Sequence, residues 1–212
     1  MTPGPVNFHP KQSSTAMQKT GPEHRRNIPV PDGGEILSAL WRITWLLTAR
    51  WTPNALNLWR RLLLRLFGAR VGSRVFIHPS STIRYPWHLS IGDRTFIHHR
   101  VLIDCNGPVS IGQDNHISQY THLCTETRNY TDLRMQILPQ PITLSDRVWL
   151  AADVFIGPGV SIGSDTIVGA RASIFSDLPD AVIAVGDGPT QIRARDDLAQ
   201  NNVATPDTPP SN

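Results

Sequence analysis

The residues with the clearest capacity for chemistry lie in the middle of the chain. An imidazole titrates near neutral pH, so a histidine there can accept a proton from an attacking hydroxyl or bind a metal ion. A carboxylate and an amide, Asp104 and Asn106, could orient such a histidine or hold the hydroxyl groups of a ligand. The alternative is that Asn106-Gly107-Pro108 is simply a turn. The histidines of this segment are His98, His99, His116 and His122.

A six-residue repeat must position these side chains. Aliphatic residues recur every six positions, with two insertions of two residues and a larger excursion from Asn129 to Thr143. Such a unit cannot bury its apolar side chain alone, so successive units must stack into a solenoid. A glycine often follows the aliphatic residue, and we attribute it to corner conformations that other residues resist. The aliphatic positions are Val71, Ile77, Ile83, Ile91, Ile97, Ile103, Ile111, Ile117, Leu123, Leu144, Leu150, Ile156, Ile162, Val168 and Ile174.

Composition favours one domain with tails in a reducing compartment. The chain has 212 residues and a formal net charge of +3. Cys105 and Cys124 lack the spacing of a disulfide framework, so reduced cysteines and a cytoplasmic location are expected. The first residues contain no apolar run of the kind that directs secretion, so we expect no export signal.

The chain divides into four parts. Residues 1–33 are rich in proline, glycine, serine and charge and predict a disordered tail. Residues 34–68 predict an amphipathic helical segment, and 69–195 the solenoid domain, with a protruding loop at 129–143 that is too long for a tight corner. Residues 196–212 predict a second disordered tail. The second helix carries an apolar stripe that includes Leu58, Leu62 and Leu66. Its basic face includes Arg60, Arg61 and Arg65.

Two roles remain open for the helical segment. It is too short on either side of Pro53 to cross a bilayer, which needs about 20 apolar residues. It can cap the open first coil of the solenoid, or residues 36–67 can lie on an anionic membrane surface as a peripheral contact, and both roles can hold together. The arginines between Arg42 and Arg84 alternate with leucine and tryptophan and form no open basic face, so a nucleic-acid partner is not expected.

A metal site is not expected among the four histidines. A zinc site needs about four ligands that converge tetrahedrally. These histidines fall on two coils and on different faces, with no cysteine partner in register. Stacked, solvated histidines are the simpler interpretation.

The hexapeptide Ile162-Gly163-Ser164-Asp165-Thr166-Ile167 shows the repeat in full, and its tandem copies resemble the left-handed parallel β-helix of hexapeptide-repeat acyltransferases. Three runs resemble the colanic acid biosynthesis acetyltransferases in particular: 61–69 with Trp41 before it, His122-Leu123-Cys124-Thr125, and 149–160. The resemblance covers about residues 36–193. It implies a mainly β fold, a single-stranded left-handed parallel β-helix with an N-terminal helical segment and disordered tails; the left hand comes from the resemblance alone.

The resemblance also implies an activity and partners. It implies a homotrimer with sites between subunits, acetyl-CoA as donor without a required metal, and a saccharide or lipid-linked saccharide hydroxyl as acceptor. The expected function is O-acetyl transfer in exopolysaccharide biosynthesis, in the cytoplasm or at the cytoplasmic membrane face. The alternative is a non-catalytic trimer that keeps a binding or structural role. A γ-class carbonic anhydrase needs three metal-binding histidines that this sequence does not place suitably.

The non-catalytic alternative rests on one sequence position. In the relatives a histidine base follows the Cys-Thr segment, whereas this chain has Arg128 there, and arginine cannot accept a proton. Three explanations remain open: His122 or His116 replaces the base, Arg128 orients an acceptor that does the proton work itself, or transfer activity is lost.

The relatives also suggest where the two substrates bind. Ala152 and Ala170 correspond to small residues along the pantetheine arm of the donor, although a tight corner demands small residues in any case. Arg171 and Arg193 are cations available for its phosphates. For the acceptor, the candidates are Asp104, Asn106 and Tyr130, the last on a loop that reaches a neighbouring subunit in the relatives.

Overall fold

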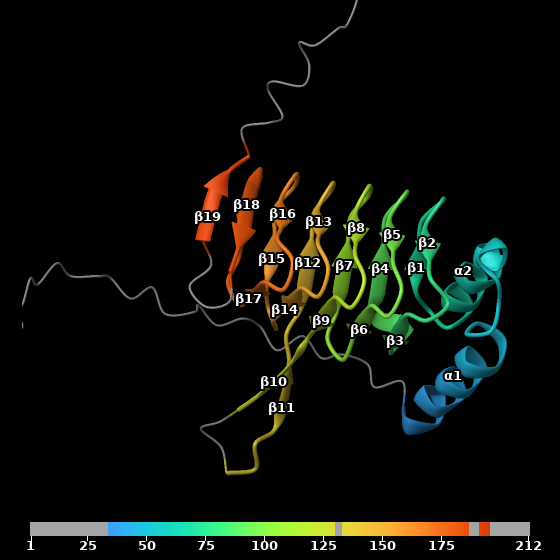
Figure 1. Ribbon diagram of the computed structural model, residues 1–212. Coiled ribbons are helices and arrows are strands. Elements are labelled where there is room, and N and C mark those ends of the chain that lie inside the picture. Colours follow the sequence, from blue (N-terminus) through green and yellow to red (C-terminus); the bar gives the residue numbers. More distant parts are fainter. Residues whose placement is uncertain (1–33, 130–132, 187–190, 196–212) are drawn as a thin grey trace, which may run out of the picture.

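The computed structural model describes residues 34–129, 133–186 and 191–195. It confirms a mainly β solenoid of parallel sheets with helices at its N-terminal end (Figure 1). The two predicted tails and Tyr130 lie outside the described residues.

Three sheets form the walls of the solenoid, and neighbouring strands in each come from successive coils. Sheet A contains β1 (Arg70–Val71), β4 (Leu89–Ile91), β7 (Val109–Ile111), β12 (Ile142–Leu144) and β15 (Ser161–Ile162). Sheet B contains β2 (Phe76–Ile77), β5 (Phe96–Ile97), β8 (His116–Ile117), β13 (Trp149–Leu150), β16 (Ile167–Val168), β18 (Val182–Val185) and β19 (Gln191–Ala194). Sheet C contains β3 (Thr82–Arg84), β6 (Leu102–Asp104), β9 (His122–Cys124), β14 (Phe155–Ile156) and β17 (Ser173–Ile174). All pairs in these sheets are parallel except β18 with β19.

The core is the inner surface of these walls. Every aliphatic residue of the six-residue register is buried, with at most 7% of its surface exposed. Ile97, Ile117 and Leu150 lie in register on three successive strands of sheet B and are fully buried. Because side chains alternate along a strand, the residues on either side of each aliphatic position face outward.

The glycines of the repeat have a different cause from the one predicted. Gly92 does not occupy the left-handed region; instead, a Cβ there would lie 2.6 Å from the carbonyl carbon of Gly112 on the next coil. Positive φ falls two residues later, at Arg94 and Asp114, whose side chains pair across the coils at 2.5 Å. The close stacking of coils therefore requires the glycines, and the left-handed conformations fall on other residues, most of them charged.

An antiparallel hairpin interrupts the coils after β9. Its strands are β10 (Glu126–Arg128) and β11 (Ile137–Pro139), and it projects away from the solenoid wall (Figure 1). The excursion expected at 129–143 thus begins at Glu126, and the chain rejoins sheet A at β12.

The helical segment packs on the first coil. It consists of α1 (Gly34–Thr48), the 3-10 turn η1 (Asn54–Leu56) and α2 (Asn57–Leu66); a second 3-10 turn, η2 (Pro86–His88), lies between β3 and β4. From α1, the buried Trp41 donates from Nε1 to the carbonyl oxygen of Ile83 at 2.7 Å. Trp45 donates similarly to Ser81 at 3.2 Å. The segment therefore covers the open end of the solenoid, as the capping role requires.

The basic face of α2 packs against the first coil, together with part of the apolar stripe. Arg60 is fully buried, and its Nε donates to the carbonyl oxygen of Ile77 at 2.8 Å. Arg61 and Arg65 donate to carbonyl oxygens of Gly72 and Val71, at 3.0 and 2.9 Å. The reason is that the first coil presents carbonyl groups with no further coil to pair them, and guanidinium groups supply the donors.

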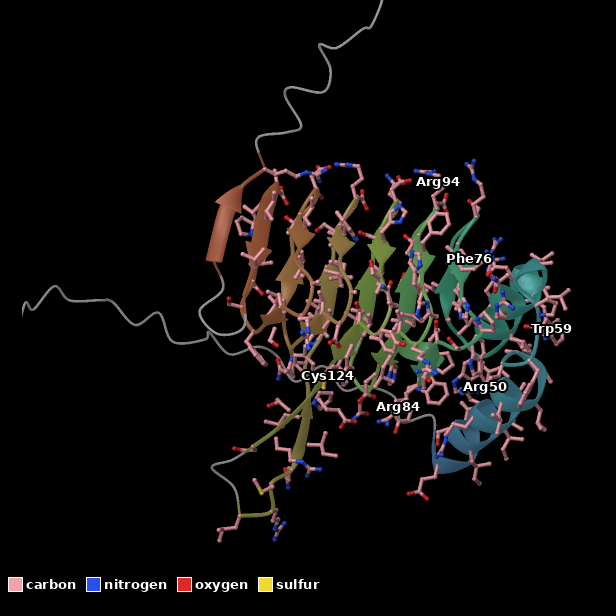
Figure 2. The ribbon with its side chains drawn as sticks, viewed as in Figure 1. Arg50, Trp59, Phe76, Arg84, Arg94 and Cys124 are labelled. Atoms are coloured by element: carbon pink, nitrogen blue, oxygen red, sulfur yellow. The ribbon has the colours of Figure 1, made fainter. Side chains whose placement is uncertain are left out.

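The predicted apolar stripe accordingly faces outward in part. Leu58, Leu62 and Leu66 are 59%, 47% and 79% exposed, while Leu63 and Leu64 are buried. Figure 2 shows Trp59 on the outer side of the helices. Among the described residues, no helix combines the length and the apolar character needed to cross a membrane.

Candidate active site

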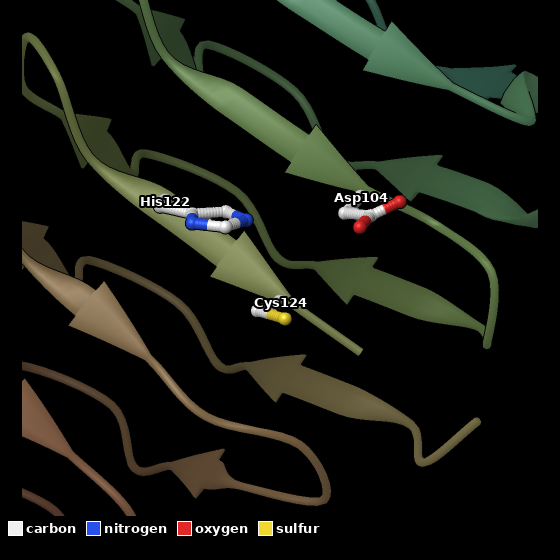
Figure 3. A group of neighbouring side chains, drawn as sticks. All are labelled: Asp104, His122 and Cys124. Carbon is white, nitrogen blue, oxygen red and sulfur yellow. The ribbon is translucent and has the colours of Figure 1, made fainter. Parts of the chain in front are cut away.

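Three chemically capable side chains converge on the outer face of sheet C. Ile103 and Leu123 point inward, so Asp104 at the end of β6 and His122 and Cys124 on β9 point outward. Asp104 and Cys124 are in direct register on the two strands. One ligand atom from each side chain lies within 4.8 Å of the other two. We call these three residues the sheet C cluster (Figure 3).

Burial dominates the electrostatics of the cluster. Asp104 is 5% exposed, and its Oδ2 pairs with Arg84 Nη1 at 3.4 Å. Its Oδ1 and the Nε2 of His122 are both buried without a hydrogen-bond partner among the described protein atoms. Burial raises the pKa of Asp104, and the charge of Arg84 opposes this shift. Burial, and then Arg84, lower the pKa of His122, so a neutral imidazole is favoured at pH 7.

Cys124 is not an activated thiol in this arrangement. Burial first, and then the neighbouring carboxylates of Asp104 and Glu126, raise the pKa of Cys124. Its Sγ lies 3.7 Å from the carbonyl oxygen of Glu126. Because the thiolate is the nucleophilic form, Cys124 is a poor nucleophile at neutral pH. Cys105 and Cys124 are both free.

The loop after β6 is tied to the base of the hairpin. Thr125 Oγ1 donates to the carbonyl oxygen of Asp104 at 2.6 Å and accepts from the backbone N–H of Gly107 at 2.9 Å. The Nδ2 of Asn106 donates to Glu126 Oε1 at 3.0 Å. The structure thus brings Asp104 and Asn106 next to the hairpin, beside His122 and Glu126 respectively. Figure 2 shows Cys124 at this base.

Arg128 and His116 lie apart from the cluster. Arg128, at the end of β10, donates from Nη1 to the carbonyl oxygen of Met135 at 3.1 Å within the hairpin. His116 is exposed on sheet B, where it stacks on Phe96 with ring centroids 5.1 Å apart. A groove of about 520 Å³ runs past it, also lined by Trp149 and Arg147. The two candidate histidines therefore occupy different walls of one chain.

Three of the four predicted donor residues share one corner of the solenoid. Ala152 and Ala170 lie on adjacent coils, and the backbone N–H of Arg171 donates to the carbonyl oxygen of Ala152 at 2.9 Å. The exposed Arg171 side chain lies 3.7 Å from Asp153 Oδ2. Arg193 lies in β19 opposite Ile183, and its side chain is outside the described part.

Sequence reasoning missed three members of this neighbourhood: Cys124, Arg84 and Glu126. The expectation that these histidines have no cysteine partner does not hold for His122, because Cys124 lies beside it on the outer face of β9. The available signal was the spacing His122-x-Cys124, which places both side chains on one face of a strand. Asp104 lies twenty residues before Cys124, the length of one coil with an insertion.

Comparison with known proteins places the chain in a family. No family model matches the chain. A protein of Escherichia coli named "Putative colanic acid biosynthesis acetyltransferase WcaF" is 40% identical over 163 residues, which cover 77% of this chain and 90% of that protein. The galactoside O-acetyltransferase of Escherichia coli is 28% identical over 130 residues, 60% of this chain and 64% of that protein.

A solved structure extends the comparison to a bound donor. The hexapeptide-repeat-containing acetyltransferase VCA0836 from Vibrio cholerae, complexed with acetyl coenzyme A, has a TM-score of 0.68 and 26% identity; the match covers 76% of this chain and 87% of that one. The repeat, the parallel solenoid and the 40% identical relative together show that the chain belongs to the hexapeptide-repeat acetyltransferases.

Proposed function

We propose that this protein transfers the acetyl group of acetyl-CoA to a hydroxyl of a saccharide, free or lipid-linked, in exopolysaccharide biosynthesis. The name of the 40% identical relative and the acetyl coenzyme A complex of the Vibrio protein support this assignment. The observation that carries it for this chain is the half-buried His122 beside Asp104, because the expected histidine is replaced by Arg128.

His122 is the proposed general base. Its lowered pKa keeps the imidazole neutral, so it can accept the proton of the acceptor hydroxyl as the oxygen attacks the thioester carbonyl. The carbon–sulfur bond then breaks, and the imidazolium returns its proton to the leaving thiolate of coenzyme A. Asp104, held by Arg84, places a carboxylate beside the imidazolium that forms between the two steps.

The remaining site residues are assigned by position. Arg128 on the hairpin and Asn106 at its base are proposed to orient the acceptor together with Tyr130, since Arg128 can donate hydrogen bonds but cannot accept a proton. Ala152, Ala170, Arg171 and Arg193 are proposed to line the path of coenzyme A. The small side chains at the corner leave room for the pantetheine arm, and the arginines offer cations to its phosphates.

The proposed assembly is a homotrimer with its sites between subunits. Light scattering coupled to size-exclusion chromatography would measure its mass directly, where three times the 23.5 kDa of one chain is expected. A monomer that transfers acetyl groups at full rate would contradict the assignment of sites between subunits.

A peripheral location at the cytoplasmic membrane face is proposed for the helical segment. Large apolar side chains on α1 and α2 are exposed. The sequence from Ile36 to Gly92 contains several arginines, Arg42 and Arg50 among them, and no acidic residue. Cosedimentation with vesicles containing anionic lipid is expected, and the double substitution Leu40→Ser with Leu47→Ser should reduce it. Equal binding by native and substituted protein would argue against this contact.

The test of the activity is thiol release from acetyl-CoA with a panel of saccharide acceptors. His122→Ala is expected to lower kcat by about 10²–10⁴-fold, the usual contribution of a general base. His116→Ala is the matched control and should retain activity. Because the pKa of His122 is lowered, activity should fall in acid only below pH 6.5, the ordinary value for histidine.

The same assay distinguishes the alternatives. Loss of activity in His116→Ala alone would move the base to sheet B. An inert native chain that gains activity through Arg128→His would favour the non-catalytic trimer, whose main support is the arginine at that position.

A further inference from the structure

We infer that Asp104, His122 and Cys124 form a binding site for a thiophilic divalent cation of the zinc class. Among the described residues this is the one group of three ligand-type side chains close enough to share an ion. The three offer an oxygen, a nitrogen and a sulfur, all of which are established zinc ligands. Three protein ligands with a fourth position open to water is the arrangement of zinc sites that are not purely structural.

The strand geometry brings the donors together without distortion of the fold. His122 and Cys124 are two residues apart on β9, so they share the outer face, and Asp104 sits directly opposite Cys124 on β6. Figure 3 shows the ring of His122 pointing toward Asp104, with Cys124 beside them. Zinc binds such ligands at about 2.0–2.3 Å, so side-chain rotations that close the 4.8 Å spacing by roughly 1 Å complete the site.

Two buried polar atoms point independently to a ligand. Asp104 Oδ1 and His122 Nε2 lie beneath the surface with no hydrogen-bond partner among the described protein atoms. The side chain of Asp104 is only 7% exposed. Buried polar atoms are almost always paired, and an unpaired one destabilises the folded state. A cation held between these atoms satisfies both.

The surrounding charges are compatible with a cation. Arg84 engages Oδ2 of Asp104 at 3.4 Å and is half exposed, so the other carboxylate oxygen remains free to bind. The carboxylate of Glu126 lies near Cys124 and adds a further negative charge. With the thiol deprotonated, the cluster carries a formal charge of −2 and offsets that of the ion. Calcium and magnesium prefer sets of oxygen ligands and do not fit this mixture.

Occupancy has a consequence for transfer that rests on the proposed function. An imidazole nitrogen that binds a metal cannot take a proton, so an ion at the cluster and base catalysis by His122 exclude one another. Micromolar zinc is therefore expected to inhibit acetyl transfer reversibly, with recovery on addition of a chelator.

The test uses the full-length protein, reduced and freed of metal by a chelator, and titrated with Co²⁺ as a spectroscopic probe for zinc. One equivalent per chain is expected, with a near-ultraviolet thiolate-to-cobalt charge-transfer band that zinc abolishes. Cys124→Ser should remove the band. Asp104→Asn should weaken binding by about 10-fold or more, since even outer-shell changes cost about 10–100-fold. Cys105 is fully buried and should not contribute.

The controls separate this site from other histidines and from misfolding. His116→Ala, on sheet B, should bind Co²⁺ as the native protein does, and thermal unfolding of each variant without metal reports whether it folds. Absence of the charge-transfer band in the native protein, or its persistence in Cys124→Ser, would overturn the metal site. Binding without inhibition would instead count against His122 as the base and leave the metal site standing.

Discussion

The walls of the solenoid and the helices that cover its first coil use side chains in opposite ways. In the walls, the aliphatic residues at every sixth position are buried, together with small polar residues such as Thr95 and Asn115. In α2, a fully buried arginine and two further arginines contact the first coil, while several leucines face solvent. The difference lies in hydrogen bonding: inside the stack each coil pairs with the next, whereas the first coil must find donors elsewhere.

The largest effect is expected from a substitution in the aliphatic core of the walls. Ile117 is fully buried and stacked between Ile97 and Leu150, so Ile117→Ala leaves a cavity that neighbouring coils cannot fill. The free energy of unfolding should fall by about 2–5 kcal/mol, measured by denaturant titration at fixed protein concentration. Ile117→Val removes a single methylene and should cost only about 0.5–1.5 kcal/mol. Equal costs for the two variants would show that this position does not carry the core.

The next largest effect is expected at the contact between α2 and the first coil. Arg60→Leu puts an apolar side chain at this buried position and removes the donors to the carbonyl oxygens of Ile77 and Pro53. We expect a loss of about 1–3 kcal/mol in the free energy of unfolding, because buried acceptors are left unpaired. Arg50→Leu, at an exposed arginine, is the matched control and should change little. If Arg60→Leu were as stable as the control, the guanidinium would not hold the cap to the coil.

The comparison also explains which parts of the fold could be predicted from sequence. The six-residue period depends only on which side chain points inward, so the buried positions follow directly from it, as Ile97 and Leu150 show. The inward face of α2 depends on the unpaired carbonyls of Val71 and Gly72, which no helical periodicity records. The sequence shows where the glycines of the repeat lie. The reason that glycine is required there is the close contact between coils, seen at Gly92, which only the stacked structure reveals.

The candidate site could be predicted only in part, for a similar reason. The resemblance identified His122 and Asp104 separately, and strand register is what brings them together. Cys124 was read as a member of a family motif, so its position beside His122 was not used.

A smaller effect is expected at the outer corners of the walls, where charges pair across coils without burial. Arg147 Nε donates to Asp165 Oδ1 at 2.7 Å, and this bond is the main cause of the lowered pKa of Asp165. A carboxylate with a lowered pKa adds stability above its ordinary value of 3.8, and that stability is lost as pH falls through the folded pKa.

Arg147→Gln should therefore lower the free energy of unfolding at neutral pH. The loss should be smaller than that of Arg60→Leu, because exposed ion pairs contribute little to stability. The two unfolding curves should converge in acid below pH 3.8. A difference that persists unchanged in acid would show that Arg147 acts through packing rather than through charge.

The smallest expected effect completes the contrast between the two regions. Leu66 belongs to the predicted apolar stripe of α2, but it is 79% exposed. Leu66→Ala should therefore change the free energy of unfolding by no more than about 0.5 kcal/mol. Leu64→Ala, two residues earlier and fully buried, should cost about 2–5 kcal/mol. A comparable cost at Leu66 would mean that this side chain is covered in the assembled protein, and the outward stripe of α2 would then be an interface between subunits.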